Sequence, residues 1–554
     1  MNAAMLLLIW LLPLLLAALS GQRYARWLTV IAVLPALIAA LTVPIGTTVS
    51  LPWLLLGVEL GLDKTGRLFL LFSSLLWLAA SLFAIGSPKG NIDSTRFRVF
   101  FLLAMAGNLG LIVAQDMLSF YLGFTLMGLA AYGLVAHPAS LRARRAARRY
   151  LAWTIAGELI LFSAIVILAQ QSGGLSFQML KTTTPSDLVV LLLIVGFGIK
   201  LALPGLHLWL PQAYAVAPAP AVAVLSGAMI KAGLLGWLRF LPPGDAALIG
   251  WGEVLMVVGV IGIFFGAING LLQRHPRLLL GYSSISKMGV LTLGIGAAWA
   301  WPAAAPALIS ALVIYAAHHA LVKGALFLGL GLVERGGLRP WIWAGLGFLA
   351  LALAGAPLTS GALAKSMLTT SLPDQAHSLL TVLGVAAFTT VALMARLLYL
   401  LWQQPAKPVA PHAMLSMLAW LLLLALIALV PFTQADASQL FSGGVALLLG
   451  LIAAALVVQN KQRLPELAKA QGRSPKARRY LRARWHRIVL LMRAMQTRSR
   501  TLGSTRRVIE NSMHDALQPG QQLQSKKGTD SWPLIGSLWL GIGALLLGAL
   551  MMMT

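Results

Sequence analysis

The residues of this sequence that could do chemistry are ionisable side chains lying inside long apolar runs. A charge at the centre of a lipid bilayer costs a few kcal/mol, so each is expected to face protein or water and to have a use. Amines, imidazoles and a carboxyl group exchange protons. The pattern therefore predicts a proton relay, and its expected members are Glu158, Lys200, His207, Lys231, His318, His319, Lys323 and Lys365.

Static ion pairs cannot account for this set, because the buried lysines outnumber the one deep acid, Glu158. For any single lysine the alternative is a side chain that reaches the interface, or a fixed ion pair. Reaching the interface is hard for Lys200 and Lys323, which have long apolar stretches on both sides. Lys287 is either an interface residue or part of the path, and Asp116 is expected to be a helix N-cap.

The composition identifies the solvent of this chain as lipid. Of its 554 residues, 59% are hydrophobic and 10% charged, with a mean hydropathy of +0.84. The absence of cysteine excludes disulfides and all-cysteine iron–sulfur ligation. No nucleotide-binding glycine motif follows a strand-like run, and the adjacent His318 and His319 point to different helix faces. We therefore expect no catalytic residue, no cofactor and no metal site in this chain.

Apolar segments long enough to cross a bilayer recur throughout the sequence. About 16 spans are predicted, at 3–20, 27–49, 66–86, 97–115, 117–136, 150–171, 187–214, 219–241, 248–272, 278–300, 303–333, 341–372, 376–402, 413–431, 438–458 and 532–553.

Some spans carry signals that interrupt a helix. The seventh contains Pro204, Gly205 and Pro211, and the twelfth Gly355, Pro357 and Gly361. The eleventh is also expected to be interrupted, around His318 to Gly324. Broken helices at matching places predict inverted repeats around a mid-membrane path. The expected fold is an all-α polytopic membrane protein, with two inverted five-helix repeats (spans 4–8 and 9–13) and broken helices 7 and 12. In this scheme Lys200 faces Lys365, and Lys231 matches Arg396.

The basic charge is concentrated near the carboxyl end. Residues 461–507 hold 15 Lys or Arg and one acid, Glu466, out of a net charge of +27. An apolar stripe with helical spacing runs through 481–502, which predicts a lateral amphipathic helix over 461–519, lying along the membrane. The alternative is a disordered basic linker. Basic residues beside spans meet anionic lipids, so a nucleic-acid partner is not expected.

Cations gather in alternate loops, above all at Arg142–Arg149, which places these loops in the cytoplasm and both termini on the other side. The predicted organisation has three helices over 1–95, repeats over 96–245 and 246–403 and spans 14–15 over 404–460. The lateral helix over 461–519 and a final anchor over 532–554 complete it.

Five ordered blocks resemble one family, the antiporter-like proton-translocating subunits of complex I, group 4 hydrogenases, formate hydrogenlyases and Mrp-type antiporters. They cover much of residues 60–400 and read DMLSFYLGFTLMGLAAYGL, GIKLALPGLHLWLPQAYAVAPAPAVAVLSGAMIKAGLLGWLRF, RLLLGYSSISKMG, HHALVKGALFLGLG and GAPLTSGALAKSML. The resemblance implies relay roles for Lys200, Lys231 and Lys323, and exchange with the far side at Lys365. A long lateral helix followed by one last span resembles the distal complex I subunit and its hydrogenase counterparts.

One position departs from the family pattern. The family usually has a glutamate in span 5, preceded by tryptophan and followed seven residues later by tyrosine. Counting back from Tyr132, that position here is Thr125, preceded by Phe124. We hypothesise that Glu158 takes over as the carboxylate. The alternative is a partly degenerate subunit that braces a complex.

The resemblance implies a proton-translocating membrane subunit of a complex I-like or hydrogenase-like assembly in a bacterial-type inner membrane. Its expected partners are other membrane subunits, redox or carrier subunits on other chains, and anionic lipids. Whether the assembly is an enzyme then depends on those chains. The alternatives are a subunit of a cation/proton antiporter or of an ion-gradient-driven uptake complex, for example for inorganic carbon, and a non-conducting structural subunit.

Overall fold

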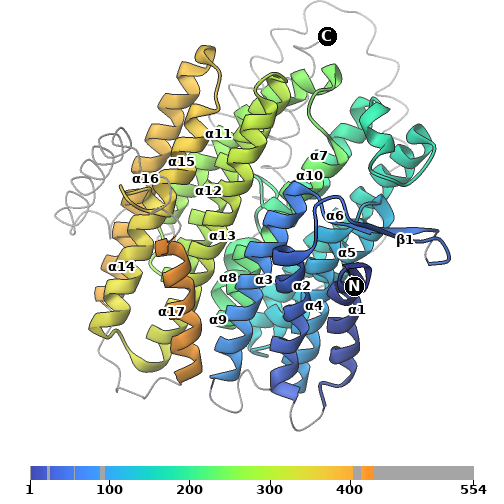
Figure 1. Ribbon diagram of the computed structural model, residues 1–554. Coiled ribbons are helices and arrows are strands. Elements are labelled where there is room, and N and C mark those ends of the chain that lie inside the picture. The colour runs from blue at the N-terminus through green and yellow to red at the C-terminus, as the bar shows by residue number, and fades with distance from the viewer. Residues whose placement is uncertain (1, 22–24, 55, 88–93, 404–413, 430–554) are drawn as a thin grey trace, which may run out of the picture. The chain divides into compact units, whose positions relative to one another are not determined.

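The computed structural model describes residues 2–21, 25–54, 56–87, 94–403 and 414–429 (Figure 1). Within these residues, nine helices are long and apolar enough to cross a membrane. The chain is therefore a mostly helical, multi-pass membrane protein. The predicted span at 438–458, the lateral helix at 461–519 and the last span at 532–553 lie outside the described residues.

The amino-terminal part contains a β-hairpin that the all-α prediction did not include. Helices α1 (Asn2–Ala18), α2 (Leu28–Thr42) and α3 (Lys64–Ile85) come first, with a 3₁₀ turn η1 (Ala25–Trp27) between the first two. Strands β1 (Thr48–Leu51) and β2 (Val58–Gly61) pair antiparallel, with Thr48 opposite Gly61. The second span was predicted to reach residue 49, which is wrong. Pro44 and the left-handed Gly46 (φ 88°) end the apolar run, and β-branched residues follow.

Three helices follow with side-chain caps at their amino ends: α4 (Thr95–Val113), α5 (Met117–Ala136) and α6 (Leu141–Ser172). The predicted N-cap at Asp116 is confirmed, since its Oδ1 accepts a hydrogen bond from the Ser119 N–H at 2.7 Å. Helix α6 begins before the predicted span at 150–171. Its first turns bury alanines and expose the arginines of 142–149, so the basic cluster lies on a helix rather than in a loop.

The break predicted in the seventh span is present between α7 (Asp187–Leu201) and α8 (Leu210–Val216). Ala202 (φ 56°) and Gly205 (φ 85°) take left-handed backbone conformations there. A helix that ends within the membrane leaves carbonyls without intrahelical partners. At this end the Ile199 carbonyl accepts from the Ala202 N–H at 3.1 Å and from the indole Nε1 of Trp209 at 2.8 Å.

The eighth span is interrupted as well, which was not predicted. It consists of α9 (Ala219–Gly227), a 3₁₀ turn η3 (Met229–Lys231) and α10 (Ala232–Phe240). Lys231 is the last residue of the 3₁₀ turn, so the lysine predicted for the relay in this span lies at the change of helix type.

The eleventh span, by contrast, is not interrupted as predicted. After α11 (Ile249–Leu271) and α12 (Pro276–Ala300), helix α13 runs without a break over Ala305–Gly336. Its prolines lie before the helix or in its first turn, where a missing backbone N–H breaks no intrahelical hydrogen bond. A Cβ on Gly324 would lie 2.3 Å from Leu76 Cδ1, so this glycine makes room for a side chain of α3 and does not end the helix.

The last described helices are α14 (Pro340–Ala354), α15 (Ser360–Thr370), α16 (His377–Trp402) and α17 (Met414–Leu429). The predicted break in the twelfth span lies between α14 and α15. It repeats a local sequence: Leu-Ala-Leu-Pro-Gly at 201–205 and Leu-Ala-Leu-Ala-Gly at 351–355, each ending on a glycine with positive φ. Short 3₁₀ turns η2 (Met179–Thr182), η4 (Ala246–Leu248) and η5 (Asp374–Ala376) lie in connections.

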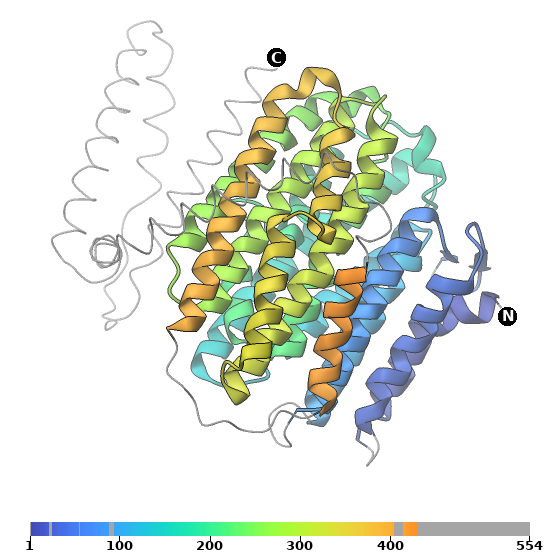
Figure 2. The same cartoon turned by 60° about the vertical axis from the view of Figure 1, so that its left-hand side comes forward.

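Helix α17 packs beside α3, far from it in sequence (Figure 2). The Ser416 hydroxyl donates to the Phe83 carbonyl at 3.1 Å, and Trp420 Nε1 donates to the Ala325 carbonyl of α13 at 2.8 Å. In a lipid environment such interhelical hydrogen bonds hold helices in register.

Candidate functional site

Glu158 and Lys200 border the same small cavity between α5, α6 and α7. Its volume is about 10 Å³, room for about one water, and aromatic rings of Phe124, Tyr150 and Trp209 line it. Glu158 and Lys200 are each 6% exposed. A Cβ on Gly128 would lie 3.1 Å from Glu158 Oε1 and 3.9 Å from Lys200 Nζ, so both groups approach one point.

Each of these two charged groups is held by a hydroxyl rather than by the other. The Thr125 hydroxyl donates to Glu158 Oε2 at 2.5 Å. Lys200 Nζ donates to the Tyr150 hydroxyl at 3.3 Å, and that hydroxyl donates to the Gly128 carbonyl at 3.1 Å. The ion pairs of the described residues do not include a Glu158–Lys200 contact. The structure therefore holds an acid and a base facing one water-sized space without a direct bond.

Gly128 offers a test of this cavity. An alanine there would place its Cβ 3.1 Å from Glu158 Oε1 and 2.9 Å from Thr154 Cγ2, which forces the carboxylate to move. We expect Gly128→Ala to reduce proton translocation severalfold. Gly347→Ala is the matched control, because Gly347 lies within α14, does not line this cavity, and a Cβ there would meet nothing within 4 Å. The measurement is the initial rate of acidification in vesicles, and equal rates for the two variants would contradict the prediction.

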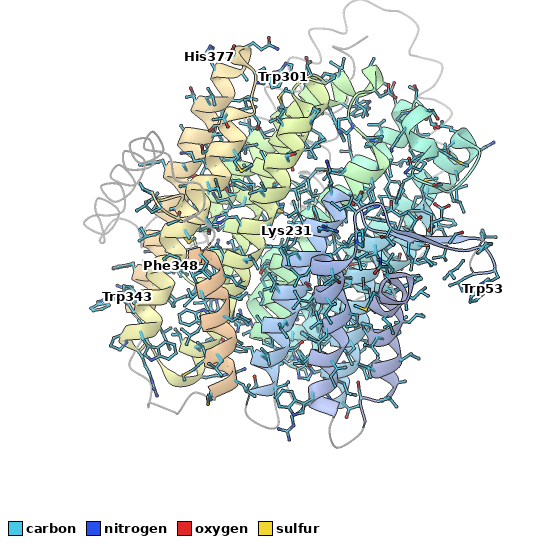
Figure 3. All side chains as sticks on the ribbon, in the orientation of Figure 1. Trp53, Lys231, Trp301, Trp343, Phe348 and His377 are labelled. Atoms are coloured by element: carbon cyan, nitrogen blue, oxygen red, sulfur yellow. The ribbon has the colours of Figure 1, made fainter. Side chains whose placement is uncertain are left out.

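The middle of the expected relay is closely packed. Lys231, His319 and Lys323 are fully buried, each at 0% exposure. Figure 3 shows Lys231 near the middle of the helix lengths, away from Trp301 and His377 at one end. Lys231 Nζ donates to the Ser226 carbonyl at 2.6 Å, and Lys323 Nζ to the Leu280 carbonyl at 2.9 Å. Both amines are therefore satisfied by neutral oxygens.

His319 differs from these lysines in having free ring nitrogens. Among the residues that the structure describes, neither its Nδ1 nor its Nε2 has a hydrogen-bond partner. His319 precedes Lys323 by four residues, so the two side chains share one face of α13. Imidazoles and amines both exchange protons near neutral or moderately basic pH, so His319 and Lys323 stay a candidate step of the predicted relay.

A second cavity lies at the break between α14 and α15. It has a volume of about 30 Å³ and is bordered by Lys287, Tyr315, His318 and Lys365. Lys287 Nζ donates to the Tyr315 hydroxyl at 3.2 Å, and His318 Nδ1 lies 2.9 Å from the Ser360 hydroxyl. The cavity is large enough for at least one water, which would connect these groups.

The two cavities repeat one arrangement. Lys287 lies over the ring of Tyr315 at 5.8 Å, as Lys200 lies over Tyr150 at 5.7 Å. In both cases the amine also donates to the phenol oxygen. The sequence scheme paired Lys200 with Lys365. In its contact with a tyrosine, however, Lys200 resembles Lys287.

The structure brings most of the predicted residues together. Glu158 and Lys200 border the first cavity, and Lys287, His318 and Lys365 border the second. His319 and Lys323 are buried on α13, the helix that also carries His318. His207 lies apart from these contacts, packed against Phe265 at 4.6 Å and Tyr282 at 6.5 Å between ring centres.

Sequence reasoning did not name Tyr150 and Tyr315, and it left Lys287 open as an interface residue or part of the path. One signal could have found the tyrosines, because each precedes an ionisable residue of its helix by eight positions. Tyr150 precedes Glu158 in α6, and Tyr315 precedes Lys323 in α13. Phenols on these faces supply neutral oxygens to lysines of neighbouring helices.

Fold and site together define a class: a multi-pass helical membrane protein with broken helices and buried amines. Among such amines, a charge on one disfavours a charge on its neighbours. The chain belongs to the family described as NADH:quinone oxidoreductase/Mrp antiporter, TM, which matches residues 114–391, half of its length. It is an antiporter-like membrane subunit.

Curated relatives match within the same region. Hydrogenase-4 component B of Escherichia coli (strain K12) is 28% identical over 293 residues, covering 50% of this chain and 43% of that protein. NADH-quinone oxidoreductase subunit N of Desulforudis audaxviator (strain MP104C) is 32% identical over 293 residues, covering 50% and 56%. The chain thus spans about half the length of these relatives.

Among solved structures, the chain is similar to one in the membrane-bound sulfane sulfur reductase, an archaeal respiratory membrane complex. The TM-score is 0.68 at 24% identity, and the match covers 76% of this chain and 75% of that one. This likeness supports the fold.

Proposed function

We propose that this chain translocates protons as a subunit of a complex I-like or hydrogenase-like energy-converting membrane complex. The observation that carries the proposal is a set of amines and imidazoles inside the helix bundle: Lys231, His319 and Lys323 are fully buried, and Lys287, His318 and Lys365 border one cavity. The amines of Lys231, Lys323 and Lys287 are bonded to neutral oxygens rather than to carboxylates, so each can gain or lose a proton without breaking an ion pair.

In the proposed relay, a proton enters at Glu158 and Lys200 and continues through Lys231, His319 and Lys323. It leaves by way of Lys287, His318 and Lys365, where the cavity at the α14–α15 break offers space for water. Like charges repel, so a proton that arrives at Lys287 favours release from Lys365. His207 is retained as a member beside the first helix break.

The proposed architecture is 16 spans with two inverted five-helix repeats, over 96–245 and 246–403. Support comes from the shared sequence at the two helix breaks and from the two lysine–tyrosine pairs. Three helices over 1–95, two spans over 404–460, a lateral helix over 461–519 and an anchor over 532–554 complete it.

The proposed partners are other membrane subunits, because the relatives are named as components or subunits of larger assemblies. In this proposal, other chains carry the redox or carrier chemistry. The exposed arginines of α6 bind anionic lipids. The proposed location is a bacterial-type inner membrane with both termini outside the cytoplasm. A cation/proton antiporter subunit is the second candidate, favoured by the family description, which includes the Mrp antiporters.

The test is proton movement in vesicles that contain the purified native complex. We expect Lys200→Ala to abolish most of the movement, because the amine that faces Glu158 is removed. Movement unchanged by Lys200→Ala would contradict the relay, and movement absent in the wild type would favour a structural subunit. Mass spectrometry of co-purifying chains separates the candidates: iron–sulfur or nickel–iron partners favour the first, and small antiporter subunits the second.

A further inference from the structure

Glu158 projects inward from a helix whose neighbouring residues face outward. In α6, Leu159 is 63% exposed and Phe162 is 51% exposed, whereas Glu158 is 6% exposed. A carboxylate in this position must find its partners on the adjoining helices. Within the described residues, its one side-chain hydrogen bond comes from the Thr125 hydroxyl of α5, at 2.5 Å.

Helix α5 holds residue 158 at two points. The Tyr121 hydroxyl donates to the backbone carbonyl of Glu158 at 3.3 Å, and the Thr125 hydroxyl donates to its carboxylate. Tyr121 and Thr125 are four residues apart, so they share one face of α5. One contact fixes the backbone and the other fixes the side chain, which together determine where the carboxylate points.

The direction matters because Lys200 lies across the cavity. Each group has a neutral partner of its own: Thr125 supplies a donor to Glu158, and Tyr150 supplies an acceptor for Lys200. Both groups remain at the cavity, where one water reaches them.

We propose that Thr125 is a positioning residue for Glu158, whose hydroxyl aims the carboxylate into the cavity and stabilises its ionised form. An O–H donor to a carboxylate forms a short, charge-assisted hydrogen bond. The hydroxyl therefore keeps Glu158 ionised to a lower pH and fixes the direction in which its carboxylate points. The inference rests on the proposed function only where transport is the readout.

The experiment compares Thr125→Val, which removes the hydroxyl and keeps the shape, with Thr125→Ser, which keeps the hydroxyl. Thr154→Val is the matched control, since Thr154 turns its methyl group toward Gly128. Two quantities are measured on the full chain in its native complex. One is the pH dependence of proton movement. The other is the infrared titration of the Glu158 carboxyl, identified by its loss in Glu158→Gln.

We expect Thr125→Val to shift the midpoint of the Glu158 titration upward by about one pH unit or more, with the acidic limb of the transport profile following it. Thr125→Ser and Thr154→Val should keep the wild-type midpoint. A wild-type midpoint in Thr125→Val would overturn the inference.

Two further results separate the inference from the proposed function. A shifted carboxyl titration in a complex that moves no protons would support the role of Thr125 and refute proton translocation. If Thr125→Val does not assemble, Thr125→Ala replaces it. A Thr125→Ser midpoint equal to that of Thr125→Ala, rather than to the wild type, would again refute the role of the hydroxyl.

Discussion

Replacing Lys323 by methionine is expected to lower the rate of proton translocation by about tenfold or more. Lys323 is fully buried and lies one helical turn from His319, whose ring nitrogens have no hydrogen-bond partner in the described part of the chain. Lys231, at the 3₁₀ turn of the eighth span, is also fully buried. Methionine has a similar length and no exchangeable proton, so it interrupts the relay at its centre.

The loss should not reflect unfolding. Lys323 Nζ donates to the Leu280 carbonyl, but the Ser284 hydroxyl donates to the same carbonyl at 3.1 Å and would still satisfy it. Lys181→Met, at an exposed lysine, is the control and should translocate as the wild type does. The measurement is dye-reported acidification of vesicles with equal amounts of assembled complex. Wild-type rates for Lys323→Met would show that protons bypass this lysine.

The sequence predicted where the charged residues lie because lipid makes charge costly and therefore informative. Lys200, Lys231 and Lys323 stand out against apolar neighbours, and all are buried in the structure. The helix breaks of the seventh and twelfth spans were predictable for a similar reason. Proline and glycine leave backbone groups without partners, and those groups need tertiary contacts such as Trp209 to the Ile199 carbonyl.

The partners of the charged residues could not be predicted. Lys200 and Lys287 both bond to phenols, and Lys231 and Lys323 both bond to backbone carbonyls. These contacts depend on helix rotation and on local helix type, which hydropathy does not encode. The 3₁₀ turn at Lys231 and the continuity of α13 escaped prediction for the same reason.

The burial of the central residues has a consequence for mechanism. Lys231, His319 and Lys323 are fully buried, whereas the two cavities of the candidate site lie beside Lys200 and Lys365. A proton wire needs donors and acceptors within hydrogen-bond reach. The centre must therefore admit water or rearrange its side chains during transport, and the helix breaks on either side are where backbone movement costs least.

The helix pair α11–α12 gives the second large prediction, which concerns stability. A Cβ on Gly259 would lie 2.5 Å from the backbone nitrogen of Leu293, so the two helices touch backbone to backbone there. Gly259→Ala is expected to destabilise the chain by about 2–3 kcal/mol, because backbone cannot move aside as a flexible side chain can.

Gly384→Ala is the matched control for this change. Gly384 also lies within a helix, but a Cβ there would meet nothing within 4 Å, so alanine should cost no stability. The measurement is the thermal unfolding of the solubilised chain followed by tryptophan fluorescence. Because α12 carries Lys287 and the Leu280 carbonyl, a shift of this helix should also slow proton translocation. If Gly259→Ala melted at the same temperature as Gly384→Ala, the close contact between α11 and α12 would be refuted, and with it the fixed position of Lys287 on which the second cavity depends.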